Sequence, residues 1–150
     1  MKIVLGFGVI ALVVALFLSN KEASPPQRAI PASTPIVQEP VDFTATFRIV
    51  TNGLTRNFSA SMYHNQSSDV YIEADDSSVV NVKREGVTWN DFFDSLPFKL
   101  TKDCLTTGTG ETFCSGSSGT LRFYLNDNEN QSLLDREIEP GDIVRITFSE

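Results

Sequence analysis

Residues 43–60 read FTATFRIVTNGLTRNFSA, and this stretch decides the class of fold. Apolar and polar residues alternate from residue 43 to residue 49, and the alternation resumes from residue 54 to residue 60. A period of two is typical of strands with one buried face. The Asn52-Gly53 pair between the two runs tolerates the positive φ angles of a tight turn. The stretch therefore predicts a β-hairpin whose inner face carries Phe43, Ala45, Phe47 and Ile49.

Residues 88–97 carry a helical pattern instead. Thr88 is a suitable N-cap, and Pro97 stops the helix because proline cannot continue it. Four large apolar side chains between them recur at i, i+3, i+4 and i+7, which is one face of a helix. These are Trp89, Phe92, Phe93 and Leu96. We expect this short helix to lie across the sheet and fill the core, against Phe47, Phe58, Phe123 and Phe148.

Further strands are predicted at residues 70–73 and 79–82, on either side of an Asp- and Ser-rich turn. Alternation returns at residues 121–125. A Glu-Pro-Gly-Asp turn at residues 139–142 then precedes a last apolar strand at residues 143–148. The order of hairpin, short strands, helix and strands predicts an α+β fold, in which a mixed sheet packs on one short helix.

That order resembles the β-grasp, or ubiquitin-like, superfamily. The closing stretch IEPGDIVRI at residues 138–146 is similar to its final turn and strand. The chain also resembles poorly characterised extracytoplasmic prokaryotic domains tethered to membranes, in which a His-rich strand precedes the helix. His64, Ser67 and Glu73 match that strand, but Met62 and Tyr71 occupy positions of its other histidines. The resemblance therefore implies the fold without implying a metal site.

The first 41 residues differ in composition from the rest. Residues 3–18 read IVLGFGVIALVVALFL, an uncharged run near the length needed to cross a bilayer. We expect residues 1–19 to form a transmembrane signal-anchor, with a removed signal peptide as the alternative. Residues 20–41 contain five prolines and read as an extended linker. Residues 42–150 form the predicted domain, on the extracytoplasmic side with the N-terminus inside.

The charge balance bears on possible partners. The chain has 12 Lys and Arg against 19 Asp and Glu, for a net charge of −7. Such a chain would repel phosphate backbones, so nucleic acid is an unsuitable partner. The Asx-rich turns at residues 75–76 and 126–130 lack the spacing of a calcium loop. No cofactor or metal is predicted.

Two cysteines, Cys104 and Cys114, lie in a Thr- and Gly-rich connection. Outside a membrane such a pair is most simply a disulfide, since two thiolates do not complete a structural zinc site. His64 is the single histidine, and no nucleophile is paired with it in the local sequence.

The sequence thus predicts a membrane-tethered binding or interaction module without evident catalytic residues. The ligand is unspecified: an envelope protein, a glycan or another surface ligand. One alternative is a structural subunit of an envelope assembly, which a large exposed apolar patch would favour. Another is a hydrolase that uses carboxylates such as Asp91, Asp94 or Asp142, which a cleft with paired carboxylates would favour.

Overall fold

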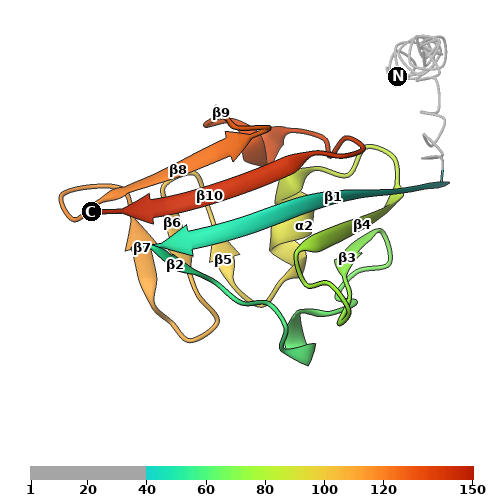
Figure 1. Ribbon diagram of the computed structural model, residues 1–150, viewed down its shortest axis with the longest axis horizontal. Helices are drawn as coiled ribbons and strands as arrows, with labels where there is room; N and C mark the ends of the chain where they lie inside the picture. Colours follow the sequence, from blue (N-terminus) through green and yellow to red (C-terminus); the bar gives the residue numbers. More distant parts are fainter. Residues whose placement is uncertain (1–39) are drawn as a thin grey trace, which may run out of the picture. The chain divides into compact units, whose positions relative to one another are not determined.

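A computed structural model describes residues 40–150, in which the main sheet is built around its first and last strands. β1 (Pro40–Thr51) and β10 (Ile143–Ser149) lie side by side and parallel (Figure 1). The sheet has the order β3-β4-β1-β10-β8-β9, and β2 pairs with the end of β1. All its other neighbouring pairs are antiparallel. The remaining strands are β2 (Leu54–Thr55), β3 (Val70–Ile72), β4 (Val79–Arg84), β8 (Thr120–Leu125) and β9 (Asn128–Glu129).

One face of this sheet is buried. Along β1, Ala45, Phe47 and Ile49 are buried, whereas the residues between them are partly or fully exposed. The same alternation runs along β8 and β10, because successive strand residues point to opposite faces. The buried set of those two strands is Leu121, Phe123, Val144, Ile146 and Phe148. The predicted α+β class, with strands alternating over a core, is therefore correct.

The helix α2 (Trp89–Ser95) packs on the buried face and lies behind β1 and β10 in Figure 1. A capping box closes its N-terminus. Thr88 Oγ1 accepts from the Asp91 N–H at 3.2 Å, and Asp91 Oδ2 accepts from the Thr88 N–H at 2.8 Å. The four apolar side chains of the expected helix face are all buried, from Trp89 at 0% to Leu96 at 4% exposed.

The aromatic side chains of the core form two groups, whereas the sequence predicts a single cluster around the helix. Phe47 packs on Phe92 with ring centroids 5.1 Å apart, and Phe58 packs on Phe47 at 5.0 Å. Phe148, which we also expected near the helix, pairs instead with Phe113 at 5.4 Å. The helix is two turns long, so its aromatic face covers one part of the sheet and a different element covers the rest.

That element is a second, three-stranded sheet, which the sequence does not predict. It comprises β5 (Lys99–Leu100), β6 (Cys104–Thr106) and β7 (Thr112–Cys114) in that order. Leu100 and Leu105 bury their side chains in the common core. Cys104 lies opposite Cys114 in the register, and the two form the predicted disulfide.

The predicted hairpin is correct at its turn and too long in its second strand. Asn52 and Gly53 have positive φ angles, as a tight turn requires. β2 nevertheless ends at Thr55, and beyond it the Asn57 side chain accepts from the Ser59 N–H at 2.7 Å. This local Asx turn competes with strand pairing, and β4 becomes the long partner of β1.

The chain between the strands adds two short 3-10 helices, η1 (Ser61–Tyr63) and η2 (Leu133–Asp135). Within residues 40–150, no helix is long and apolar enough to cross a membrane. The predicted anchor at residues 3–18 and most of the linker at residues 20–41 lie outside the described residues. Pro40 and Val41, which we assigned to the linker, are the first residues of β1.

Candidate anion-binding face

The face of the main sheet opposite α2, here called the open face, carries one acidic side chain on β1, β10 and β8, which is Asp42, and Asp42 pairs with Lys83 of β4 at 2.6 Å. Its residues alternate with the buried ones, so their side chains point away from the core. They are Asp42, Thr44, Thr46, Arg48 and Val50 of β1, Ile143, Arg145, Thr147 and Ser149 of β10, and Thr120, Arg122 and Tyr124 of β8. The charged residues in this set are Asp42 and three arginines, Arg48, Arg122 and Arg145.

Two of these arginines stand in one row across the strands. Arg48 lies opposite Arg145 in the parallel register, and Arg145 lies opposite Tyr124 in the antiparallel one. The Arg145 guanidinium carbon is 4.0 Å from the centre of the Tyr124 ring. The aromatic ring attracts the cation and limits its rotamers. Arg122 lies one row further along, opposite Thr147. The three cations therefore share one face of adjacent strands.

These three arginines have no carboxylate partner among residues 40–150. The ion pairs of this part of the chain involve other cations: Arg56 with Glu111, Lys83 with Asp42, Arg84 with Asp69 and Lys102 with Asp135. Like charges on neighbouring strands destabilise a sheet unless something offsets them. A chain of net charge −7 thus exposes three arginines that form no ion pair within residues 40–150, although Asp127 lines the same cleft as Arg48 and Arg145.

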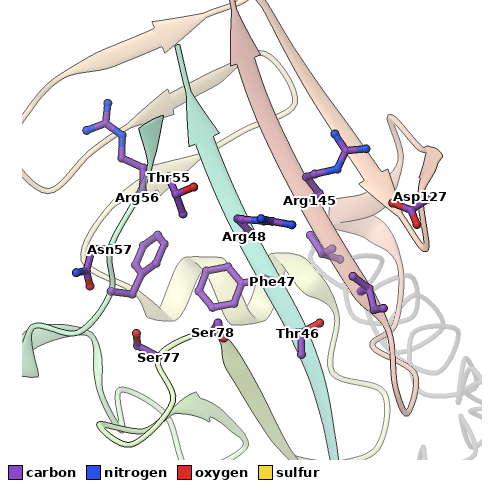
Figure 2. A pocket seen from close by; sticks show the side chains of 13 residues that line it. Thr46, Phe47, Arg48, Thr55, Arg56, Asn57, Ser77, Ser78, Asp127 and Arg145 are labelled. Atoms are coloured by element: carbon purple, nitrogen blue, oxygen red, sulfur yellow. The ribbon is translucent and has the colours of Figure 1, made fainter. Parts of the chain in front are cut away.

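A cleft of about 590 Å³ opens beside this row of arginines (Figure 2). Arg48 and Arg145 line one side of it, together with Thr46. Hydroxyl and amide side chains from the other side include Thr55 and Asn57. Its lining also contains Phe47, Phe58, Ser77, Ser78, Asp127, Ile143 and Val144. The volume lies within the range of small-ligand sites, and the lining combines cations with hydrogen-bonding groups.

The cleft exists because the pairing of β1 is interrupted on one edge. The ladder with β4 ends at Thr46, and the ladder with β2 begins at Val50. One backbone hydrogen bond borders this gap at each end. The Phe47 N–H donates to the Ser78 carbonyl at 3.0 Å, and the Arg56 N–H donates to the Ile49 carbonyl at 2.8 Å. Both neighbouring segments then leave the plane of the sheet, which leaves the space beside Arg48.

An ordered turn forms the lower wall of the cleft. Asp76 Oδ1 accepts from Ser78 Oγ at 2.6 Å and from the Ser78 N–H at 3.1 Å. These bonds to the charged form hold the pKa of Asp76 below its ordinary value of 3.8. The carboxylate is therefore ionised at neutral pH and fixes the turn that presents Ser77 to the cleft.

The carboxylates proposed for a hydrolase have structural partners. Asp91 caps α2, and Asp94 Oδ2 accepts from Asn90 Nδ2 at 2.7 Å. The buried Asp142 accepts from Asn126 Nδ2 at 3.1 Å and from the backbone N–H of Glu139 at 3.0 Å. None of the three lines the cleft or the second cavity, of about 180 Å³, beside Tyr63 and Phe98. Neither cavity therefore contains a pair of these carboxylates.

The described part of the chain shows no group of side chains arranged to bind a metal ion or to activate a nucleophile. His64 Nε2 lies 3.1 Å from the Phe58 carbonyl oxygen, which it can reach as a donor. Residues 40–150 contain no group of three or more His, Cys, Asp or Glu side chains placed to hold a metal ion. The disulfide occupies both thiols. The cleft and the open face offer guanidinium, hydroxyl and amide groups, which can bind a ligand.

Our sequence analysis treated Arg48, Arg122 and Arg145 as ordinary polar positions of alternating strands. A signal was present, since each of these three strands carries an arginine at an outward position although the chain as a whole is acidic. The strand order that places them side by side was needed to see it. Comparison of the chain with protein-family models, curated proteins and solved structures gives no match.

Proposed function

We propose that this protein is a binding module whose open face captures a carboxylate-bearing glycan outside a membrane. The observation that carries the proposal is the set of three aligned arginines, Arg48, Arg122 and Arg145, without carboxylate partners in residues 40–150. Guanidinium groups bind carboxylates through paired, charge-assisted hydrogen bonds. An anionic ligand would supply the ion-pair partners that these three arginines lack.

The polar lining supports a glycan over a partner protein. Protein interfaces are also enriched in Arg and Tyr, but their buried cores need large apolar side chains gathered in one patch. The large apolar residues exposed in the described part of the chain are Leu54, Met62 and Ile143. Leu54 and Ile143 lie opposite Thr51 and Thr46, five positions apart on β1, and so form no common patch. Hydroxyl and amide groups around the cleft suit the hydroxyl groups of a sugar.

The proposed architecture is that of a β-grasp domain on a membrane tether. Its support is the parallel pairing of the first and last strands, flanked by antiparallel neighbours, with one helix on the buried face. The tether rests on the uncharged run at residues 3–18 and the proline-rich stretch that follows it. This arrangement would present the open face to polymers at the cell surface.

The proposal can be tested by calorimetric titration of full-length protein, in neutral detergent, with polygalacturonate. We expect binding that weakens as salt rises from about 0.05 to about 0.5 M, because salt screens exposed charges. Arg48→Gln and Arg145→Gln should each weaken binding by about tenfold. Arg136→Gln is the matched control, because it removes the same charge from the end of η2 and lines neither cavity.

Two results would overturn the proposal. One is binding of a neutral polysaccharide of matched length as tightly as polygalacturonate. The other is an equal loss of affinity in the Arg136 control and in the open-face variants, since net charge alone would then explain the effect.

A further inference from the structure

Arg56 borders the cleft with its backbone but directs its side chain elsewhere. Its Nε donates to Thr51 Oγ1 at 2.6 Å, and its Nη1 donates to Glu111 Oε2 at 2.9 Å. Its guanidinium carbon also lies 4.8 Å from the centre of the Phe113 ring. Thr51 is buried, so the guanidinium lies on the core side of the sheet, away from Arg48 and Arg145 (Figure 2).

These contacts join the wall of the cleft to the second sheet. Residues 55–58 form the wall, and their backbone pairing with β1 is short: the Thr55 pairing with Val50 and the Arg56 amide bond to Ile49. Two side chains add to this attachment, since Phe58 packs on Phe47 and Arg56 donates to Thr51. Past Arg56 the segment leaves the ladder. Arg56 supplies additional anchorage, because Glu111 and Phe113 both belong to the β6–β7 hairpin.

The disulfide closes that hairpin at its base. Cys104 and Cys114 face each other across β6 and β7, and Phe113 adjoins one of the two half-cystines. At the other end, the Thr107 N–H donates to the Glu111 carbonyl at 2.8 Å. A covalent bond that closes a hairpin restricts the conformations its strands can adopt. Of the three groups that hold Arg56, Glu111 and Phe113 therefore belong to a hairpin that the crosslink closes, whereas Thr51 belongs to β1.

We propose that Arg56 is a positioning residue, through which the disulfide-closed hairpin holds the cleft wall in its ligand-binding position. Thr55 and Asn57 of this wall are among the residues that line the cleft. Loss of the clamp leaves the arginines of the open face in place and frees the groups opposite them. The predicted effect of Arg56 on affinity rests on the proposed glycan binding. Its predicted effect on the position of the wall is independent of any ligand.

The test measures hydrogen exchange of the Arg56 amide, whose bond to Ile49 reports attachment of the wall. It uses the full-length protein without ligand. Glu111→Gln should speed exchange about threefold by removing an exposed ion pair. The double variant Cys104→Ser/Cys114→Ser should speed it about tenfold or more. Lys102→Gln is the control, because it breaks the ion pair of Lys102, in the β5–β6 connection, with Asp135 of η2 and does not touch Arg56.

Polygalacturonate titration of the same variants provides the second reading. Faster exchange together with weaker binding in Glu111→Gln, and neither change in Lys102→Gln, is the expected result. Unchanged Arg56 exchange in Glu111→Gln and in the folded cysteine variant overturns the clamp. Faster exchange with unaltered affinity overturns its role in binding. If the unmodified protein does not bind polygalacturonate, the glycan proposal fails, and the exchange rates alone decide the clamp.

Discussion

Gly119 and Gly116 face each other in an isolated bridge between β7 and β8, yet their surroundings differ. A Cβ added at Gly119 would lie 2.5 Å from Phe148 Cζ and 2.7 Å from the Ser149 carbonyl oxygen. At Gly116 the same atom would have nothing within 4 Å. The φ angles are 157° and 159°, so backbone conformation does not distinguish the two positions.

We therefore expect Gly119→Ala to destabilise the protein by about 1–3 kcal/mol, because the methyl group must displace both a core ring and the last strand. Gly116→Ala should cost less, because it carries only the backbone strain of the positive φ angle that both positions share and meets no close atom. Urea denaturation of the two variants measures the difference. Equal effects would show that the close approach of Phe148 to Gly119 is not rigid.

At the scale of single elements, α2 depends on its packing. It has seven residues, too few for an isolated helix to be stable in water. Its N-terminus is closed by the capping box, and its apolar face contacts Phe47 through Phe92. Tertiary contacts, rather than helix propensity, must hold it in place.

Phe92→Ala should consequently cost about 3–5 kcal/mol, since it removes a fully buried ring and leaves a cavity. Asp91→Ala should cost about 1 kcal/mol, the usual value of an N-terminal cap. Thermal denaturation followed by circular dichroism compares them. A Phe92 variant that melts no earlier than the Asp91 variant contradicts the assignment of α2 as the element that fills the core.

The elements that the sequence failed to predict have a shared cause. β5, β6 and β7 are two or three residues long, which is too short for any periodicity to appear. Their stability comes from pairing with one another, from the disulfide and from burial of Leu100 and Leu105. The second strand of the first hairpin was predicted too long because the apolar and polar residues still alternate beyond Thr55, where a local Asx turn ends the strand pairing.

At the scale of the whole molecule, the proposed function requires that the domain be held at a membrane as well as a binding site. We predict that residues 3–18 keep the full-length protein in membranes through carbonate extraction, because the run has no charge. Replacing Val13 and Val14 by Arg should release it, since arginine is costly in hydrocarbon. Fractionation followed by immunoblotting measures both. An N-terminus of the mature protein near residue 20–24 would instead identify a removed signal.

The sequence alone determined the α+β class, the Asn52-Gly53 turn, the strand before the helix, the helix itself and the disulfide. Each of these is encoded by neighbours in the chain: a period of two, a period of 3.6, a pair of turn residues, or two cysteines in one connection. Residues close in sequence suffice to predict the turn, the strand and the helix, because the interactions involved are local. The disulfide was predicted because two cysteines alone do not complete a zinc site.

Tertiary structure decided the candidate site. Arg48 and Arg145 are 97 positions apart and become neighbours only because β1 and β10 pair in parallel. The cleft arises where two separate segments, ending at Thr55 and beginning at Val79, leave part of the β1 edge unpaired. Arg56 joins a third segment to these through Glu111. Contacts between distant segments depend on strand order and register, which local patterns do not specify.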